Sequence, residues 1–168
     1  TSLLSIGVAA IRKNSFIVAA FLNTVLLSLF IWNFDFIMQL ITGESFWGIT
    51  DFFFKQMPWA ARFVSLEHFF LAPLGLLLLY LVKLERNDSW KLSIFIIFVS
   101  GWASYLFTDP VENVNCAFES CVTFMGGDYY QPIWMSALYI MALLSGLIIN
   151  RFSIFFSKEF NDKKRLRR

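Results

Sequence analysis

Apolar residues fill four long stretches of this chain, and each stretch is apolar on every side rather than striped along one face. The stretches cover residues 15–35, 62–82, 90–107 and 132–150. A helix needs about 20 apolar residues to cross the hydrocarbon of a bilayer. Helices that are apolar all round belong to membrane spans or deep cores. The pattern therefore predicts an all-α, polytopic membrane protein, built as a bundle of four transmembrane helices.

The segment between the first two spans is aromatic but interrupted. Between residues 42 and 59, Phe and Trp alternate with charged residues, Gly and Pro. This segment is too polar to cross hydrocarbon, whereas amphipathic aromatic rings gather at the headgroup level. We expect a partly helical segment that lies in the membrane interface. Pro73 and Gly75, inside the second span, predict a kink rather than an end, because membrane helices tolerate both residues.

Composition agrees with a membrane protein. Of the 168 residues, 58% are hydrophobic, and there are only 14 basic and 12 acidic residues. Soluble domains devote about a quarter of their residues to charge. A chain of this length suffices for one domain. We therefore expect residues 1–168 to form a single integral-membrane domain that ends in a basic tail, residues 151–168.

Basic residues are distributed unevenly over the predicted loops. Twelve of the 14 fall on the side that holds both termini: Arg12, Lys13, Lys83, Arg86, Lys91, Arg151, Lys158, Lys163, Lys164, Arg165, Arg167 and Arg168. Only Lys55 and Arg62 fall on the other side. Short loops rich in Lys and Arg stay in the cytoplasm. We expect both termini in the cytoplasm, an acidic outer face and a bacterial inner membrane as the location.

Three ionisable residues lie at span depth: Asp35 in the first span, and Glu67 and His68 in the second. His68 precedes Lys83, at the inner boundary, by 15 residues, which is about 22 Å of helix. Asp35 lies at a similar height, so antiparallel packing would bring the three side chains together. Ionisable side chains at such depth are costly and face a protein interior or a wet cavity. This cluster is the candidate site.

Three roles remain open for the cluster: a structural hydrogen-bonded group, which we favour, proton or quinone chemistry, and metal binding. A metal site usually takes three or more protein ligands, and the chain has one His. Glu67 and His68 also point about 100° apart on a helix, so they do not easily share one ion. The sequence identifies no cofactor.

Cys116 and Cys121 fall in the predicted outer loop, where a bacterial periplasm is oxidising. A disulfide across this short gap is feasible. Thiol oxidoreductases rely on Cys-x-x-Cys, which tunes the attacking thiolate, and that spacing is absent. We therefore expect a structural disulfide, or two free thiols, rather than a catalytic pair.

The end of the tail is polybasic. Its five basic residues are Lys163, Lys164, Arg165, Arg167 and Arg168. Beside a membrane helix such residues attract anionic lipid headgroups, each with about 1 kcal/mol. The alternative is that they serve only as a topology signal. A lipid-interacting protein that works through this tail is the weakest of our three functional hypotheses.

The leading hypothesis is an accessory, non-catalytic subunit of a larger integral-membrane complex, in an energy-transducing or oxidoreductase assembly. Channels and transporters need polar pathways through the midplane, and these spans carry few polar residues. The partners would be membrane lipids and other integral-membrane subunits, and no feature suggests nucleic acid. The alternative is a small membrane enzyme, or a metal- or quinone-binding subunit, that uses Glu67, His68 and Asp35 near the outer leaflet.

Overall fold

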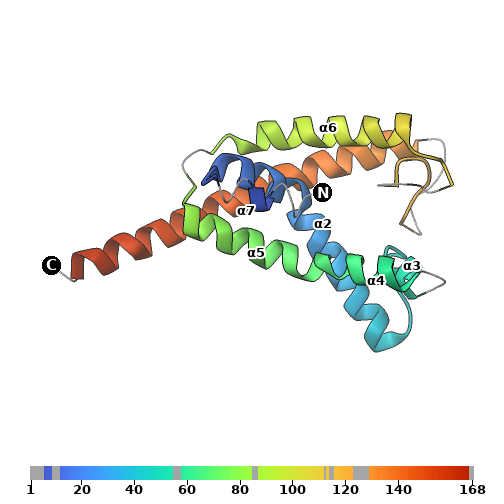
Figure 1. Ribbon diagram of the computed structural model, residues 1–168, viewed down its shortest axis with the longest axis horizontal. Coiled ribbons are helices and arrows are strands. Elements are labelled where there is room, and N and C mark those ends of the chain that lie inside the picture. The colour runs from blue at the N-terminus through green and yellow to red at the C-terminus, as the bar shows by residue number, and fades with distance from the viewer. Residues whose placement is uncertain are drawn as a thin grey trace.

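The computed structural model describes residues 6–8, 12–54, 58–84, 87–111, 113, 116–122 and 129–166, with the backbone alone for residues 61 and 154–166. The long helices are α2 (Ser15–Thr42), α5 (Glu67–Val82), α6 (Ser89–Phe107) and α7 (Tyr130–Leu166), and the short ones are α3 (Asp51–Phe54) and α4 (Trp59–Ser65) (Figure 1). These described residues contain no strand.

Four helical segments are long and apolar enough to cross a membrane: Ser15–Thr42, Arg62–Val82, Ser89–Phe107 and Tyr130–Ser153. The all-α class and the presence of four candidate spans are thus confirmed. Two boundaries differ from the expected ones by more than two residues. α2 runs past residue 35 to Thr42, where Gly43 ends it in the left-handed conformation with φ of 81°, and α7 continues into the basic tail as far as Leu166.

The second span is interrupted near its start rather than at its proline. α4 ends at Ser65 and α5 begins at Glu67, whereas Pro73 lies inside α5. Leu66, between the two helices, keeps a right-handed helical conformation, and its N–H still bonds to the carbonyl groups of Arg62 and Phe63. The chain therefore passes from α4 to α5 with little change in backbone geometry.

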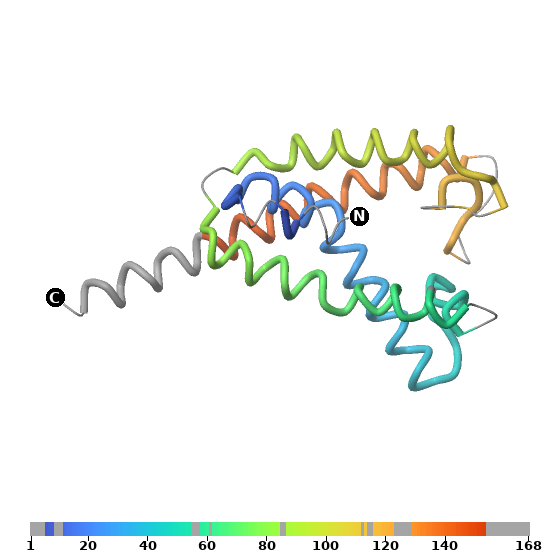
Figure 2. The backbone as a smooth tube through the Cα atoms, viewed as in Figure 1, coloured from blue at the N-terminus to red at the C-terminus, as the bar shows by residue number. Residues whose placement is uncertain are grey.

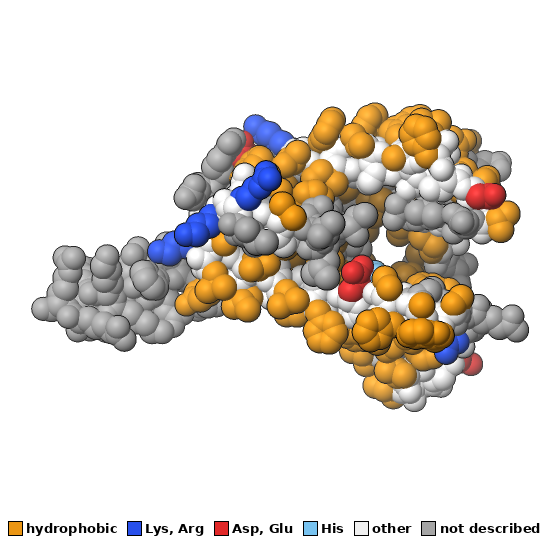
Figure 3. All heavy atoms as spheres, in the orientation of Figure 1, with side chains coloured by type: hydrophobic (Ala, Val, Ile, Leu, Met, Phe, Trp, Pro, Cys, Tyr) orange, Lys and Arg blue, Asp and Glu red, His pale blue; other side chains and the backbone are white. Residues whose placement is uncertain are grey.

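α2 is the central helix, because it packs against α5, α6 and α7. α6 and α7 lie side by side, while α5 follows α2 and diverges from them toward the end of the molecule that carries α3 and α4 (Figure 2). We call α6 and α7 the α7 arm, and α3, α4, α5 and the last turns of α2 the α5 arm. Lys and Arg gather at the opposite end, which we call the basic end (Figure 3).

The apolar core lies between α2 and α5 and is closed at its side by Ile6 and Ile149. Leu22 and Leu26 of α2 are fully buried there. Gly75 of α5 lets α2 approach closely, since a Cβ atom at this position would lie 2.7 Å from Leu22 Cδ1. Small residues at helix contacts replace the hydrophobic driving force that is missing between helices in lipid.

A buried polar seam joins α2 to α6 and α7. Its side chains are Asn23, Ser89, Ser93 and Ser145. Asn23 Nδ2 donates to Ser89 Oγ (3.1 Å), and Ser93 Oγ donates to the carbonyl oxygen of Ala20 (2.9 Å). Ser145 Oγ accepts from the backbone N–H of Leu27 (3.3 Å). The seam therefore fixes the register of three helices near the basic end.

Gly146 tests how tightly the seam is packed. A Cβ atom there would meet Trp90 Cβ at 3.5 Å and Asn23 Nδ2 at 3.6 Å, which are ordinary contacts. We expect Gly146→Ala to leave the midpoint of thermal unfolding in detergent nearly unchanged. Gly146→Ile should destabilise the bundle by about 1–3 kcal/mol, because the added atoms separate α7 from α2. Equal stability of the two variants would contradict this packing.

Candidate functional site

Asp35 is the most deeply buried ionisable side chain of the candidate cluster, with no exposed surface. Its carboxylate accepts four hydrogen bonds from the loop that follows α2. The donors are Ser45 Oγ (2.7 Å), the N–H of Trp47 (2.7 Å), and the N–H and Oγ1 of Thr50 (both 2.9 Å). Charge-assisted hydrogen bonds of this kind are about twice as strong as neutral ones. Asp35 therefore holds residues 45–50 against the end of α2.

This use of Asp35 separates it from the other two members of the cluster. The four hydrogen bonds that its carboxylate accepts all come from residues 45–50. The carboxylate therefore binds the loop rather than Glu67 or His68. No group of three or more His, Cys, Asp or Glu side chains that could hold a metal ion occurs among the described residues. Asp35 thus has an architectural position, and Glu67 and His68 are the members of the candidate cluster that do not bond to this loop.

His68 lies against α2 near the start of α5. Its ring stacks on the Trp32 indole, with centroids 4.6 Å apart. Nδ1 lies 2.7 Å from the carbonyl oxygen of Ser65, so this nitrogen carries the proton and donates. In the neutral ring Nε2 is then an acceptor. Asn33 Nδ2 donates to the His68 carbonyl oxygen at 3.2 Å, which ties the site to α2.

Two acceptors beside His68 lack donors within the described chain. The Glu67 carboxylate is only partly buried and has no hydrogen bond or ion pair there. Asn33 Oδ1 is buried and has no hydrogen-bond partner there either. A buried polar atom without a partner costs about 1–3 kcal/mol, so such atoms call for an explanation. Sequence reasoning missed Asn33, although an amide within an apolar stretch is a recognisable signal.

Aromatic rings surround the site and fasten the α5 arm together. Trp32 stacks on Phe36 at 5.1 Å, and Phe69 of α5 meets both rings edge-on at 5.6 and 5.1 Å. Phe53 and Phe54 of α3 reach Phe36 at 4.9 and 5.1 Å. The interrupted aromatic segment is thus partly helical, as expected, and it packs on the bundle. Its position at a membrane interface stays a prediction.

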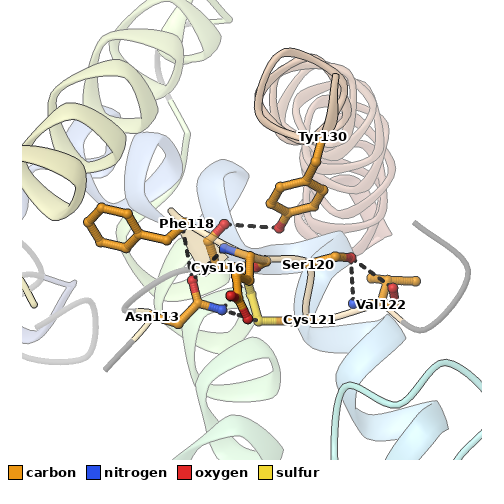
Figure 4. The surroundings of a disulfide bond; sticks show 8 residues. Asn113, Cys116, Phe118, Ser120, Cys121, Val122 and Tyr130 are labelled. Carbon is orange, nitrogen blue, oxygen red and sulfur yellow. Dashed lines mark hydrogen bonds between the residues drawn. A yellow bond between two sulfur atoms is a disulfide. The ribbon is translucent and has the colours of Figure 1, made fainter. Parts of the chain in front are cut away.

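Cys116 and Cys121 form a disulfide with an S–S distance of 2.03 Å (Figure 4). Asn113 organises the loop around it. Its Oδ1 accepts from the N–H groups of Phe118 and Glu119 (both 3.0 Å), and its Nδ2 donates to the Glu119 carbonyl oxygen (2.9 Å). An Asn side chain bonded to nearby backbone is ordinary turn chemistry.

The disulfide loop also connects the two helices of the α7 arm. Tyr130, the first residue of α7, donates from its hydroxyl group to the Cys116 carbonyl oxygen at 2.9 Å (Figure 4). The Phe118 ring stacks on Tyr105, near the end of α6, at 5.2 Å. These contacts assign the loop a bracing role at this end of the arm.

The side chains of the polybasic cluster lie outside the described part of the chain. Lys163, Lys164 and Arg165 are on the helical backbone of α7, which projects beyond the bundle (Figure 1). Arg167 and Arg168 fall outside the described residues.

A comparison of the chain with models of known protein families, with curated proteins and with solved structures finds no match.

Asp35→Asn tests the architectural role of the carboxylate. The amide keeps the shape but loses the charge and one acceptor oxygen, so some of the four donors are left unpaired. We expect a loss of about 1.5–3 kcal/mol in unfolding free energy in detergent. Amide exchange of residues 45–50 should also accelerate. Glu44→Gln, an exposed neighbour in the same loop, is the control and should change neither quantity; equal effects of the two variants would refute the assignment.

The disulfide has its own test. Replacing Cys116 and Cys121 together by Ser should cost about 2 kcal/mol, the entropy expected for so short a closed loop. Hydrogen exchange should quicken in residues 116–122 and in the first turn of α7, but not at the seam. Faster exchange at Asn23 and Ser93, with the loop unchanged, would contradict the local bracing role.

Proposed function

We propose that this chain is an accessory subunit of a larger integral-membrane complex, an energy-transducing or oxidoreductase assembly of a bacterial inner membrane. The observation that carries the proposal is the contrast between interior and surface. Buried polar side chains join helices at the seam or, at Asp35 and Thr50, hold the loop after α2, while bulky apolar side chains on all four long helices remain exposed. Examples are Phe34, Leu77, Phe98 and Leu147.

The surface supports an assembly partner better than a transport pathway. Channels and transporters line their route with polar or charged groups near the midplane. The seam hydroxyl groups and Asn23 Nδ2 are instead bonded between helices, whereas Asn23 Oδ1 is buried without a hydrogen-bond partner among the described residues. Exposed aromatic and aliphatic helix faces suit packing against other subunits, pigments or lipid. The basic end would face the cytoplasm with both termini, and the tail would bind anionic headgroups.

Purification in a mild detergent tests this function. We expect the chain to migrate in native gels well above the mass of its 19.5 kDa monomer. Other integral-membrane proteins should copurify with it in fixed ratio after stringent washing. Recovery of a stable monomer, with the candidate-cluster variants showing an enzymatic defect instead, would replace this proposal with the enzyme alternative.

A second candidate function rests on the unpaired acceptors around His68. The Glu67 carboxylate, His68 Nε2 and Asn33 Oδ1 would accept hydrogen bonds from a proton-carrying ligand, such as a quinol. Asp35 drops out of the proposed ligand set because the loop occupies it. His68→Ala should abolish quinol binding or activity if this alternative is right. If His68→Ala lowers only thermal stability, through the lost stacking on Trp32, then His68 is structural.

A further inference from the structure

One face of α2 is covered by the α7 arm at the basic end and is about half exposed or more at the other end, where the Phe34 ring also meets Phe46 and Trp47 of the following loop. Asn23 and Leu27 lie on this face, and both bond to the α7 arm through the seam. The residues that continue the face at helical spacing are Phe30, Phe34, Ile37 and Ile41. Their exposed fractions are 56, 49, 46 and 75%. The surface that packs α2 against the α7 arm therefore extends beyond the point where the arm leaves it.

This uncovered face borders an opening between the two arms. α2 and α5 slope away from α6 and α7 (Figure 1), and the space-filling view shows open space between the arms at the end opposite the basic end (Figure 3). Helices in a membrane are expected to close such gaps through side-chain packing.

Each wall of the opening is braced independently. The four hydrogen bonds to Asp35 and the rings around Phe36 hold α2 to the α5 arm. The Cys116–Cys121 loop holds α6 to α7. Each wall therefore holds its own shape independently of the other, and both walls are preorganised for an occupant.

The chemistry of the occupant follows from Glu67. On α5, Glu67 shares a side with Leu71, Leu74 and Leu78, and these three residues line a groove against Ile6. Glu67 lies one turn before Leu71 on that side, at the end of α5 where the two arms are apart (Figure 1). An unpaired carboxylate at span depth is costly and pairs with a cation where one is supplied.

A second copy of this chain is a poor source of that cation. Among the described residues of the four candidate spans, Lys91 and Arg151 lie at the basic end, and Arg62, five positions before Glu67, is the one basic residue near its depth. Arg62 already takes part in an interaction within its own chain. Charge complementarity favours a different protein.

We propose that the opening receives a transmembrane helix of a partner subunit, which packs on Phe30, Phe34, Ile37 and Ile41 of α2 and places a Lys or Arg beside Glu67. The proposal rests on the accessory-subunit function and adds where the partner binds and which charge it brings.

Photo-crosslinking in native membranes tests the location. Benzoylphenylalanine at position 30 or 37 should yield an adduct whose peptide maps to a transmembrane helix of another protein with a Lys or Arg. The matched controls are positions 95 and 147, which are 61 and 64% exposed on other faces; they should give at least tenfold less of this adduct. Lipid adducts or self-adducts at positions 30 and 37 would overturn the proposal.

Glu67→Gln tests the charge. We expect at least tenfold less partner in detergent eluates and an unchanged melting temperature of the subunit, because Glu67 has no described partner within the chain. Glu44→Gln, an exposed acidic control, should retain the partner. Full retention by Glu67→Gln would overturn the charge pairing.

The outcomes also separate this proposal from the proposed function. A partner that copurifies but crosslinks from positions 95 or 147 preserves the accessory role and overturns the docking site. Absence of any copurifying protein overturns both.

Discussion

Hydrogen bonding between helices near the basic end is the interaction on which the rest of this structure depends. In hydrocarbon, apolar side chains gain little by leaving lipid for a neighbouring helix, so close packing and polar contacts must hold the bundle. The Asn23–Ser89 and Ser93–Ala20 bonds join α2 to α6, and Ser145 joins α7 to α2. Each bond is modest alone, with an average of about 0.6 kcal/mol in membrane helices. Together they fix which faces meet.

The position of this seam explains the shape of the molecule. The seam bonds α2 to the α7 arm only near the basic end, so beyond Leu27 the two arms are free to separate. Local braces then stabilise each arm: the Asp35 carboxylate and its aromatic neighbours in one, and the Cys116–Cys121 loop in the other. The same arrangement leaves an apolar face of α2 uncovered. A protein built in this way is suited to receiving another helix, and this is the physical basis of the proposed accessory role.

Sequence patterns predicted the helices far better than their mutual arrangement. Long apolar stretches dictate helices because every backbone group must be satisfied internally, so the third span was placed to within a residue of Ser89–Phe107. The end of α2 was missed because Asp35 resembles a boundary residue. Its charge is in fact stabilised by hydrogen-bond donors from residues 45–50, a contact that depends on how the loop folds back.

For the candidate site, too, the sequence predicted positions along the helices but not the contacts between them. Counting residues along the predicted spans put Asp35, Glu67 and His68 at similar heights. Hydrophobic periodicity did not predict which face of α2 packs against α5. The structure pairs His68 with Trp32 and Asn33 and turns Asp35 toward the loop. The aromatic partner carries no distinctive motif, since Phe and Trp are compatible with lipid-facing or interface positions. Asn33 did carry a signal, because an amide in an apolar stretch is costly without a partner.

The most direct measurement of the central claim is a double-mutant cycle between Asn23→Ala and Ser89→Ala, with reversible unfolding followed in bicelles. A hydrogen bond in the seam predicts that the two changes are not additive, with a coupling of about 0.6 kcal/mol and at most about 1.7 kcal/mol. A cycle between Asn23→Ala and Ser136→Ala, at an exposed site on α7, should show no coupling. Strictly additive effects of Asn23→Ala and Ser89→Ala would contradict the account.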